Sequence, residues 1–316
     1  MNKDIVVGID TSNYTTSVAL MSIDGELIAN IKRPLPVKAG ECGLRQSDAV
    51  FAHVKNIPSA MEEAREYLAG RIPVAVGVST RPRNIDGSYM PCFLSGVSVA
   101  EGIAAVSGIP LYRYSHQCGH VMAAIYSSRR YDLLERGSFC AFHVSGGTTE
   151  VLRVNPTDTA FLAELVGGTK DLNAGQVIDR IGVFMGLPFP SGAHVEELAL
   201  KNTAKIPSKK ISGSDISVNL SGLENMAKNL YQKSGDKSLT SAFVLDYIGK
   251  ALCSLAEAYE EKYGKSEFVF SGGVMSNLII KGMLAQKFSA SFAEPRLSSD
   301  NAVGIAALVV RQLLKK

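Results

Sequence analysis

The sequence predicts an α/β protein built from two lobes. Strand and helix patterns alternate through both halves of the 316-residue chain, as in proteins whose sheets are covered by helices. One arrangement, an apolar strand, a small polar turn and a second apolar strand, occurs twice, with the two copies 135 residues apart. A chain of this length forms one large domain or two compact ones, and we expect two.

The first copy of this arrangement lies at the N-terminus. Ile5–Ile9 is apolar and β-branched, the turn DTSNYTT follows, and a strand pattern resumes over Ser17–Met21. The second copy reads FCAFHVSGGTTEVLRV, with its turn at Ser145–Thr149. Asp10 of the first copy aligns with Ser145 of the second, 135 residues later, which indicates two related halves of similar size.

A third turn, FVFSGGVMSN, covers Phe268–Asn277 and joins a buried-looking strand to a helix pattern. Gly272 and Gly273 would let backbone N–H groups approach a phosphate or ribose at the start of that helix. The alternative is a tight strand-to-helix turn without a ligand. The presence of three such turns in one chain favours the binding interpretation.

Apolar periodicity predicts five helices between these turns. They cover Val54–Leu68, Gly96–Ser107, Asn173–Met185, Leu239–Tyr263 and Ala302–Leu314. Ala204–Asn219 is rich in Lys, Ser and Gly, and is predicted to be a long surface loop. Its lysines suit an acidic partner, although solvated lysines on a loop are the more common case.

The composition indicates a folded protein in a reducing compartment. Apolar residues make up 46% and charged residues 20%, and the net charge of +3 neither indicates nor excludes a nucleic acid partner. The chain begins directly with a strand pattern, and its longest apolar stretches are well short of a membrane span, so we expect a cytoplasmic protein. Five scattered cysteines without a C-x-x-C pair argue against a disulfide framework: Cys42, Cys92, Cys118, Cys140 and Cys253.

The stretch SHQCGH contains a candidate metal site. His116 and His120 are four residues apart, which places both rings on one face of a helix within reach of a single ion. The alternative is two histidines whose hydrogen bonds are satisfied within the protein. In zinc peptidases with H-E-x-x-H, the general base follows the first His, but here Gln117 follows it, and an amide accepts no proton from a metal-bound water. Peptide hydrolysis by that mechanism is therefore disfavoured.

Two further positions are relevant to this candidate metal site. Cys118 lies about 200° around the helix from both histidines, so we expect it to be a buried spectator. Asp300, in the stretch SSDN, precedes the last helix pattern and offers a carboxylate as a third ligand. It also suits the N-cap of that helix, and the two roles are chemically compatible.

Eight short motifs occur in the order and spacing of one known family: GIDTS, SHQCGH, VSGGTT, AGQVIDR, GLPFPSG, LSGL, SGGVMSN and SSDNA. Over nearly its whole length the chain resembles the catalytic subunit of tRNA threonylcarbamoyladenosine synthesis (TsaD), a family once called O-sialoglycoprotein endopeptidase or glycoprotease. The resemblance implies the two-lobed actin, hexokinase and Hsp70 fold, with a ligand in the cleft. We accordingly expect one lobe at 1–122 plus 304–316, and the other at 123–303.

The resemblance also implies the ligands. One divalent metal, Zn, Fe or Mn, would be bound by His116, His120 and Asp300. An adenine nucleotide, threonylcarbamoyl-AMP or ATP/AMP, would contact the matching positions of four motifs. These positions are Ser145, Gly146, Gly147, Thr148, Thr149, Asp179, Gly192 and Asn277, to which the turn pattern adds Gly272 and Gly273.

By the same resemblance, the expected reaction is transfer of threonylcarbamoyl from threonylcarbamoyl-AMP to N6 of an adenosine in tRNA, with release of AMP. The metal would polarise the carbamoyl carbonyl, Asp179 would position the ribose hydroxyls, and backbone donors at Gly146 and Gly147 would hold the reacting group. We expect Asp10 and Ser145 to be catalytic. Family members usually act with a small paralogous helper subunit and an ATPase.

Several positions depart from the family pattern. The family's Glu, His, Asp, Glu and Lys are replaced by Cys118, Thr148, Leu172, Gln176 and Glu224, and Asn13, Tyr14 and Thr15 stand where Cys-Asp-Glu is usual. STRPRNIDG, with Arg81–Gly87, replaces the usual G-P-G-L stretch. The ligand-holding positions mostly remain, so the pattern favours a diverged paralogue with an altered acceptor. The alternative is a non-catalytic nucleotide- and metal-binding regulator or partner subunit.

Overall fold

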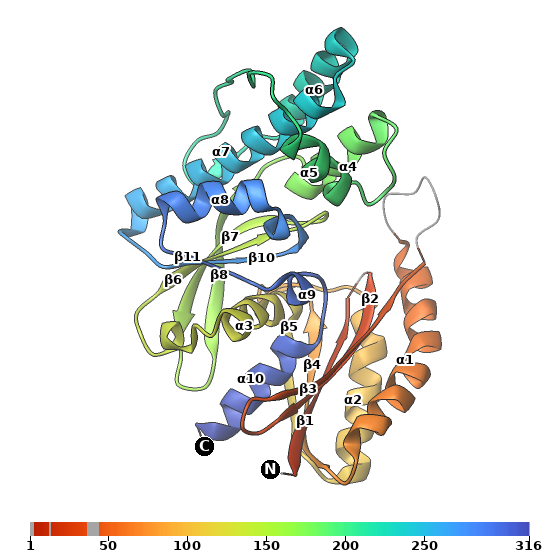
Figure 1. The fold of residues 1–316 in the computed structure, drawn as a ribbon. Helices are drawn as coiled ribbons and strands as arrows, with labels where there is room; N and C mark the ends of the chain where they lie inside the picture. The colour runs from red at the N-terminus through yellow and green to blue at the C-terminus, as the bar shows by residue number, and fades with distance from the viewer. Residues whose placement is uncertain (1–2, 13, 37–43, 316) are drawn as a thin grey trace. The chain divides into compact units, whose positions relative to one another are not determined.

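The computed structural model describes residues 3–12, 14–36 and 44–315 (Figure 1). Asn13 and Cys42 lie outside the described residues. The chain forms two compact units. Unit 1 comprises Met1–Glu135, Pro156–Ala163 and Asp300–Lys316, and unit 2 comprises Arg136–Asn155 and Glu164–Ser299. The α/β class predicted from the alternating patterns is confirmed.

Unit 1 contains a five-stranded sheet in the order β3-β2-β1-β4-β5. Its strands are β1 (Asp4–Thr11), β2 (Thr15–Ser22), β3 (Leu27–Pro34), β4 (Ile72–Arg81) and β5 (Leu111–Ser115). The predicted N-terminal hairpin is β1 and β2, which run antiparallel with Asp10 opposite Ser17. Strands β4 and β5 continue the sheet in parallel with β1, so the C-terminal ends of β1 and β4 lie at one edge.

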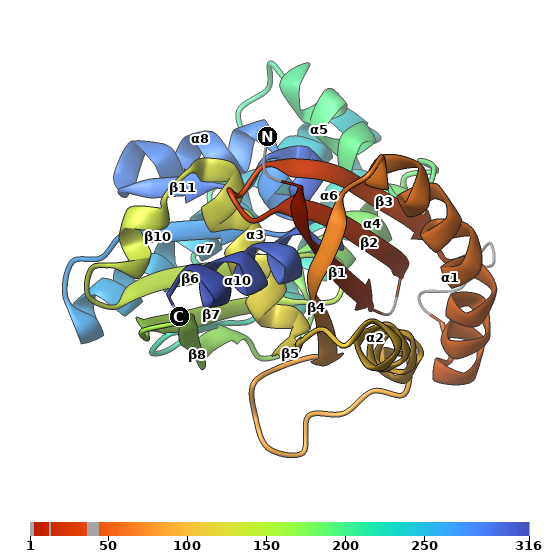
Figure 2. The same ribbon diagram turned by 90° about the horizontal axis from the view of Figure 1, so that it is seen from below.

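Helices cover both faces of this sheet (Figure 2). Side chains of a strand alternate between the two faces, so Ile5 and Ile9 pack with α1 and α2, whereas Gly8 lies against α10. A Cβ on Gly8 would come within 2.7 Å of the Ala302 carbonyl oxygen, so the absence of a side chain lets α10 lie directly on β1. The helices of unit 1 are α1 (Gln46–Leu68), α2 (Phe93–Ser107), α3 (His116–Ser128) and α10 (Val303–Leu314), with a 3-10 turn, η1, at Tyr131–Leu134.

In unit 1, two helices begin earlier than the periodicity predicts. Helix α1 begins at Gln46, because the buried Ala49 and His53 extend its inner face by two turns although neither is strongly apolar. Helix α2 begins at Phe93 instead of Gly96. The expected lobe boundary after residue 122 falls inside α3, which packs on α10, and unit 1 extends to Glu135.

Unit 2 contains a six-stranded sheet in the order β11-β10-β6-β7-β8-β9. The second predicted hairpin is β6 and β7, with Val144 opposite Thr149. The expected loop at residues 204–219 contains one short strand, β9. The strands are β6 (Phe139–Val144), β7 (Thr149–Pro156), β8 (Phe161–Thr169), β9 (Ser217–Val218), β10 (Phe268–Ser271) and β11 (Ala290–Phe292).

In unit 2, the sequence predicted the helices at Asn173–Met185 and Leu239–Tyr263 and a helix after β10, but it did not predict the three helices at Gly192–Leu200, Ser221–Ser234 and Pro295–Ser298. A 3-10 turn, η2 (Gly273–Ser276), separates β10 from the following helix, so the glycines do not open that helix directly. The helices are α4 (Ala174–Phe184), α5 (Gly192–Leu200), α6 (Ser221–Ser234), α7 (Lys237–Tyr263), α8 (Leu278–Lys287) and α9 (Pro295–Ser298). Among the described helices α7 alone is long and apolar enough to cross a membrane, and 78% of its most apolar window is buried in the structure.

Candidate functional site

The two histidines of SHQCGH lie in the first turn and a half of α3. Strand β5 passes into α3 without a loop, and Ser115, the last residue of the strand, caps the helix by accepting a hydrogen bond from the Cys118 N–H at 3.2 Å. The Nε2 atoms of His116 and His120 are 3.0 Å apart. The predicted placement of both rings on one helix face is therefore confirmed.

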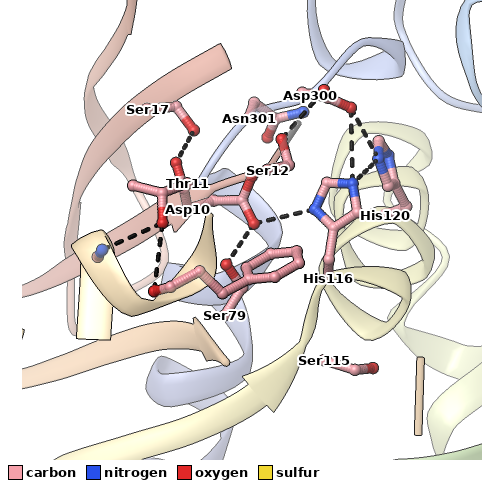
Figure 3. A network of polar contacts seen from close by, with 12 residues as sticks. Asp10, Thr11, Ser12, Ser17, Ser79, Ser115, His116, His120, Asp300 and Asn301 are labelled. Atoms are coloured by element: carbon pink, nitrogen blue, oxygen red, sulfur yellow. Dashed lines mark hydrogen bonds and ion pairs between the residues drawn. The ribbon is translucent and has the colours of Figure 1, made fainter. Parts of the chain in front are cut away.

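Asp300 completes a three-residue cluster with the two histidines (Figure 3). Its Oδ1 lies 3.3 Å from Nε2 of His120 and 3.6 Å from Nε2 of His116. The three candidate ligand atoms lie within 4.8 Å of one another, which suits one ion with bonds of about 2.0–2.2 Å to each. Among the described residues this is the only group of three or more His, Cys, Asp or Glu side chains with such spacing.

Asp10 supports His116 from the end of β1. Its side chain is fully buried, and its Oδ1 accepts hydrogen bonds from Nδ1 of His116 at 2.9 Å and from the Ser79 hydroxyl at the end of β4. Since a carboxylate only accepts, Nδ1 carries the proton, and in the neutral ring Nε2 presents its lone pair toward Asp300 and His120. The second carboxylate oxygen, Oδ2, is buried without a hydrogen-bond partner among the described residues.

The charges of this cluster stabilise one another. Burial lowers the pKa of His116, but the Asp10 and Asp300 carboxylates outweigh it and raise the pKa to about 10. Burial opposes ionisation of Asp300, but His116 and His120 hold its pKa well below the ordinary value. Burial and the neighbouring His116 lower the pKa of His120. Without a metal the cluster thus holds a proton on His116, and a divalent cation would displace it.

The sequence did not predict three further polar residues that interact with this cluster. The Ser12 hydroxyl donates to Oδ2 of Asp300 at 3.0 Å, and Ser79 donates to Asp10. Lys32 of β3 is half-buried, and burial lowers its pKa although the Asp300 charge raises it. The motif GIDTS gave the signal for Ser12, whereas the sequence around Ser79 and Lys32 gave none.

The remaining predictions for this region are mixed. Cys118 is buried, as predicted, and burial raises its pKa. The four described cysteines are free thiols, as expected without a disulfide framework. The predicted N-cap role of Asp300 is wrong, because the Asn301 side chain accepts the hydrogen bond from the Val303 N–H at 3.0 Å.

In unit 2, the turn Ser145–Thr149 lies against the start of α4. The Ala174 N–H donates to the Thr149 hydroxyl at 2.9 Å, and a Cβ on Gly175 would come within 2.7 Å of the Gly146 nitrogen. Cβ atoms on Gly146 and Gly147 would meet no described atom within 4 Å, so that side of the turn is open. A helix N-terminus beside an open glycine turn is a common anion-binding arrangement.

The third glycine turn lies beside the second. Gly272 has φ +96°, and a Cβ there would come within 2.2 Å of the Val144 carbonyl oxygen. This close approach places Gly272 and Gly273 next to the start of the Ser145 turn, because β10 and β6 are neighbouring parallel strands. The structure therefore brings together the two glycine turns that the sequence predicted for a nucleotide.

Asp179, Gly192 and Asn277 occupy the segments around these turns. Oδ1 of Asp179 accepts from the Ser191 N–H at 2.8 Å and thereby fixes the loop before Gly192, and burial raises the pKa of Asp179. Oδ1 of Asn277 accepts from the Ile280 N–H at 3.0 Å and caps α8. Both side chains thus have structural bonds that the motifs alone did not predict.

Comparison with known proteins establishes the family. The sequence model of tRNA N6-adenosine threonylcarbamoyltransferase (TsaD) matches residues 42–307. The chain belongs to the TsaD family. The tRNA N6-adenosine threonylcarbamoyltransferase of Streptococcus suis strain 05ZYH33 is 30% identical over 332 residues, which cover 100% of this chain and 95% of that protein. The TsaD protein of Bacillus licheniformis is 28% identical over 96% of this chain and 91% of its own length.

Solved structures agree on the fold. Full-length HypF in its phosphate- and nucleotide-bound form gives a TM-score of 0.63 at 12% identity, over 99% of this chain and 47% of HypF. Component A of (R)-2-hydroxyglutaryl-CoA dehydratase from Acidaminococcus fermentans gives 0.56 at 15% identity, over 99% of both chains. A ROK family glucokinase from Streptomyces griseus gives 0.51 at 15% identity, over 96% of this chain and 98% of the kinase. The predicted actin-like fold is confirmed.

Proposed function

We propose that this protein transfers the threonylcarbamoyl group of threonylcarbamoyl-AMP to N6 of an adenosine in tRNA. The N6 amine attacks the carbamoyl carbon, the bond from that carbon to the phosphate oxygen breaks, AMP leaves, and the amine loses a proton. Family membership supports a tRNA substrate and a nucleotide ligand. The observation that carries the proposal is the His116, His120 and Asp300 cluster, whose ligand atoms lie within 4.8 Å of one another.

These three residues fit a single Zn, Fe or Mn ion, which would supply a Lewis acid for the carbamoyl carbonyl. We propose that Asp10, instead of reacting itself, holds His116 in the tautomer whose Nε2 is free for the ion. Its buried position and its bond to Ser79 support this positioning role.

In unit 2, we propose that the open glycine turns hold the adenylate through backbone N–H groups. The turn residues would be Ser145, Gly146, Gly147, Thr148, Thr149, Gly272 and Gly273. Asp179 would bind ribose hydroxyls, with Gly192 and Asn277 beside the nucleotide. The Ser145 hydroxyl, at the end of β6, would be a catalytic donor to the oxygen that gains charge as the carbamoyl carbon is attacked.

One departure from the family pattern has a local explanation. Glu224 replaces the Lys of the family motif, which by itself would repel tRNA phosphates. Its carboxylate lies 3.0 Å from Arg180 and 2.6 Å from Lys228, so the negative charge is paired with two cations. This pairing reduces the repulsion that an isolated carboxylate would exert on tRNA phosphates. A small paralogous helper and an ATPase are proposed as its partners.

The test measures metal content and tRNA modification together. Wild-type protein, His116→Ala and Asp300→Ala are purified and analysed for metal, with the exposed His194→Ala as the control histidine variant. Each is then given threonylcarbamoyl-AMP, unmodified tRNA and a lysate that lacks its own TsaD activity but supplies helper proteins. Mass spectrometry of the tRNA nucleosides reports the transfer.

The expected result is one metal per chain and modified adenosine for the wild type and His194→Ala, and neither for the two site variants. A wild type that binds metal and AMP but modifies no tRNA in the supplemented lysate would support the non-catalytic alternative. Modification that survives both site substitutions would contradict the proposed role of the cluster.

A further inference from the structure

His53 is a fully buried polar residue on the inner face of α1. The other buried residues of that face are Ala49, Ile57, Ala60 and Ala64. A polar side chain in such a place requires hydrogen-bond partners, because an unsatisfied buried donor or acceptor costs about 1–3 kcal/mol. The identity of those partners indicates what His53 does.

Both ring nitrogens of His53 contact the N-terminal hairpin. Nε2 lies 2.8 Å from the Ser12 carbonyl oxygen, and Nδ1 lies 2.8 Å from the Thr16 hydroxyl. A carbonyl oxygen only accepts, so Nε2 carries the proton, and in the neutral ring Nδ1 accepts from Thr16. The Thr16 oxygen in turn accepts from the Asn56 amide at 3.3 Å. One neutral tautomer thus satisfies both ring nitrogens of His53.

Ser12 connects this network to the candidate metal ligand. Its carbonyl oxygen accepts from His53, while its hydroxyl donates to Oδ2 of Asp300 at 3.0 Å. His53 also binds Thr16, which lies on the second strand of the hairpin opposite Thr11. The ring therefore holds Ser12 itself and the second strand of the hairpin at Thr16, which restricts the direction of the Ser12 hydroxyl.

The carboxylate of Asp300 uses its two oxygens differently. Oδ2 accepts from Ser12, whereas Oδ1 faces Nε2 of both histidines. The bond to Oδ2 therefore opposes rotation of the carboxylate and keeps Oδ1 directed at the two rings. A change in the position of Ser12 would alter this direction.

We propose that His53 and Ser12 form a positioning pair that orients Asp300 as a ligand with one oxygen toward the metal. The inference rests on the metal centre proposed above, and neither residue contacts the reacting atoms. The competing explanation is that His53 only fills the core beneath α1. A purely structural residue would change the stability of the protein but not its affinity for metal.

The experiment measures the dissociation constants of Zn²⁺ and Mn²⁺ by calorimetry on metal-free protein. The variants are Ser12→Ala, His53→Asn, His53→Gln and the double variant Ser12→Ala/His53→Asn. A Gln amide nitrogen reaches the place of Nε2 and can still donate to Ser12, whereas the shorter Asn amide reaches only the place of Nδ1. The comparison therefore isolates the bond to Ser12.

We expect Ser12→Ala and His53→Asn each to weaken metal binding by about 10-fold, with His53→Gln close to the wild type. The double variant should bind metal no more weakly than either single variant, because both substitutions interrupt the same series of contacts from His53 through Ser12 to Asp300. Ile57→Ala lies one turn along the same buried face and is the matched control. It should lower the melting temperature and leave the dissociation constants unchanged.

Wild-type affinity in His53→Asn would overturn the inference, as would a double variant about 100-fold weaker than wild type, the product of two independent effects. If His53→Asn does not fold, Ser12→Ala still removes the hydroxyl that binds Asp300, and an unchanged affinity in that variant overturns the inference. Failure of the wild type to bind metal is a separate result, because it refutes the metal centre itself.

Discussion

Gly119 of α3 and Gly304 of α10 meet where the two helices cross. A Cβ on Gly304 would lie 1.8 Å from the Gly119 carbonyl oxygen, and 2.8 Å from the Ala123 nitrogen. No side chain fits between these backbones. The contact brings the start of α10, and Asp300 just before it, to the helix turn that carries His116 and His120.

Gly304→Ala is therefore expected to separate α3 from α10. We expect a loss of about 1–3 kcal/mol in the free energy of unfolding, because the new methyl group forces the helices apart. Metal affinity should fall at the same time, since Asp300 moves away from the histidines. Denaturant unfolding and metal calorimetry measure the two effects. Gly102→Ala in α2 is the control, because a Cβ there meets nothing within 4 Å, and equal behaviour of the two variants would contradict the crossing argument.

Asp10→Asn is expected to weaken metal binding by about 10–100-fold, as is usual for a partner that orients a ligating histidine. The amide can present its N–H to Nδ1 of His116 and so favour the wrong tautomer. Ser79→Ala should have a smaller effect, because it removes only the donor behind Asp10. Calorimetry with Zn²⁺ measures both variants. Wild-type affinity in Asp10→Asn would show that the tautomer is fixed by other groups.

Asp171 is expected to make unit 2 sensitive to acid. Burial opposes its ionisation, but the Ser221 hydroxyl and the Leu220 and Ser221 N–H groups at the start of α6 lower its pKa to about 2. Its folded pKa thus lies below the ordinary value of 3.8, so its stabilisation is complete above pH 3.8 and disappears as the pH falls toward 2. Asp171→Asn should lower the free energy of unfolding at pH 7 by about 1 kcal/mol, the usual value of a helix cap. Between pH 4 and pH 2 this variant should lose less stability than the wild type. Unfolding of both proteins across this range is the measurement, and parallel curves would contradict the assignment.

His53 is expected to make the stability of the protein depend on pH near neutrality. Burial lowers its pKa below 6.5, although Ser12 and Asp10 oppose this, so the unfolded chain binds the proton more readily. Its contribution to stability is therefore complete above pH 6.5 and is lost as the pH falls below that value. His116 titrates in both proteins, so the difference in unfolding free energy between wild type and His53→Gln isolates His53. That difference should shrink from pH 8 to pH 5. A difference independent of pH would refute the assigned contribution of His53.

The sequence predicted those features that depend on residues close to one another in the chain. The two hairpins follow from alternating apolar residues around Asp10 and Ser145, and the helix face of His116 and His120 follows from their spacing. Asp300 is 180 residues from His120, so the sequence offered it only as one available carboxylate, and the family resemblance then assigned it to the same ion. Their contact depends on a helix crossing that no local pattern contains.

The residues that the sequence did not predict have partners far away in the chain. Ser12 and Asp300 are 288 residues apart, Ser79 and Asp10 are 69 apart, and His53 binds a backbone atom 41 residues away. A serine at a strand end and a histidine on an apolar helix face are both ordinary in isolation. Their roles follow from the sheet order and from the packing of α1, which a single sequence does not specify.

The direct passage from β5 into α3 limits how this chain can change in length. Ser115 is both the last residue of the strand and the cap of the helix, so no intervening loop can absorb an inserted residue. One extra residue after Ser115 would rotate both histidine rings by about 100° about the helix axis and turn them from Asp300. Insertions and deletions should therefore be tolerated in the segment between β4 and α2, residues 82–92, but not at the junction before His116.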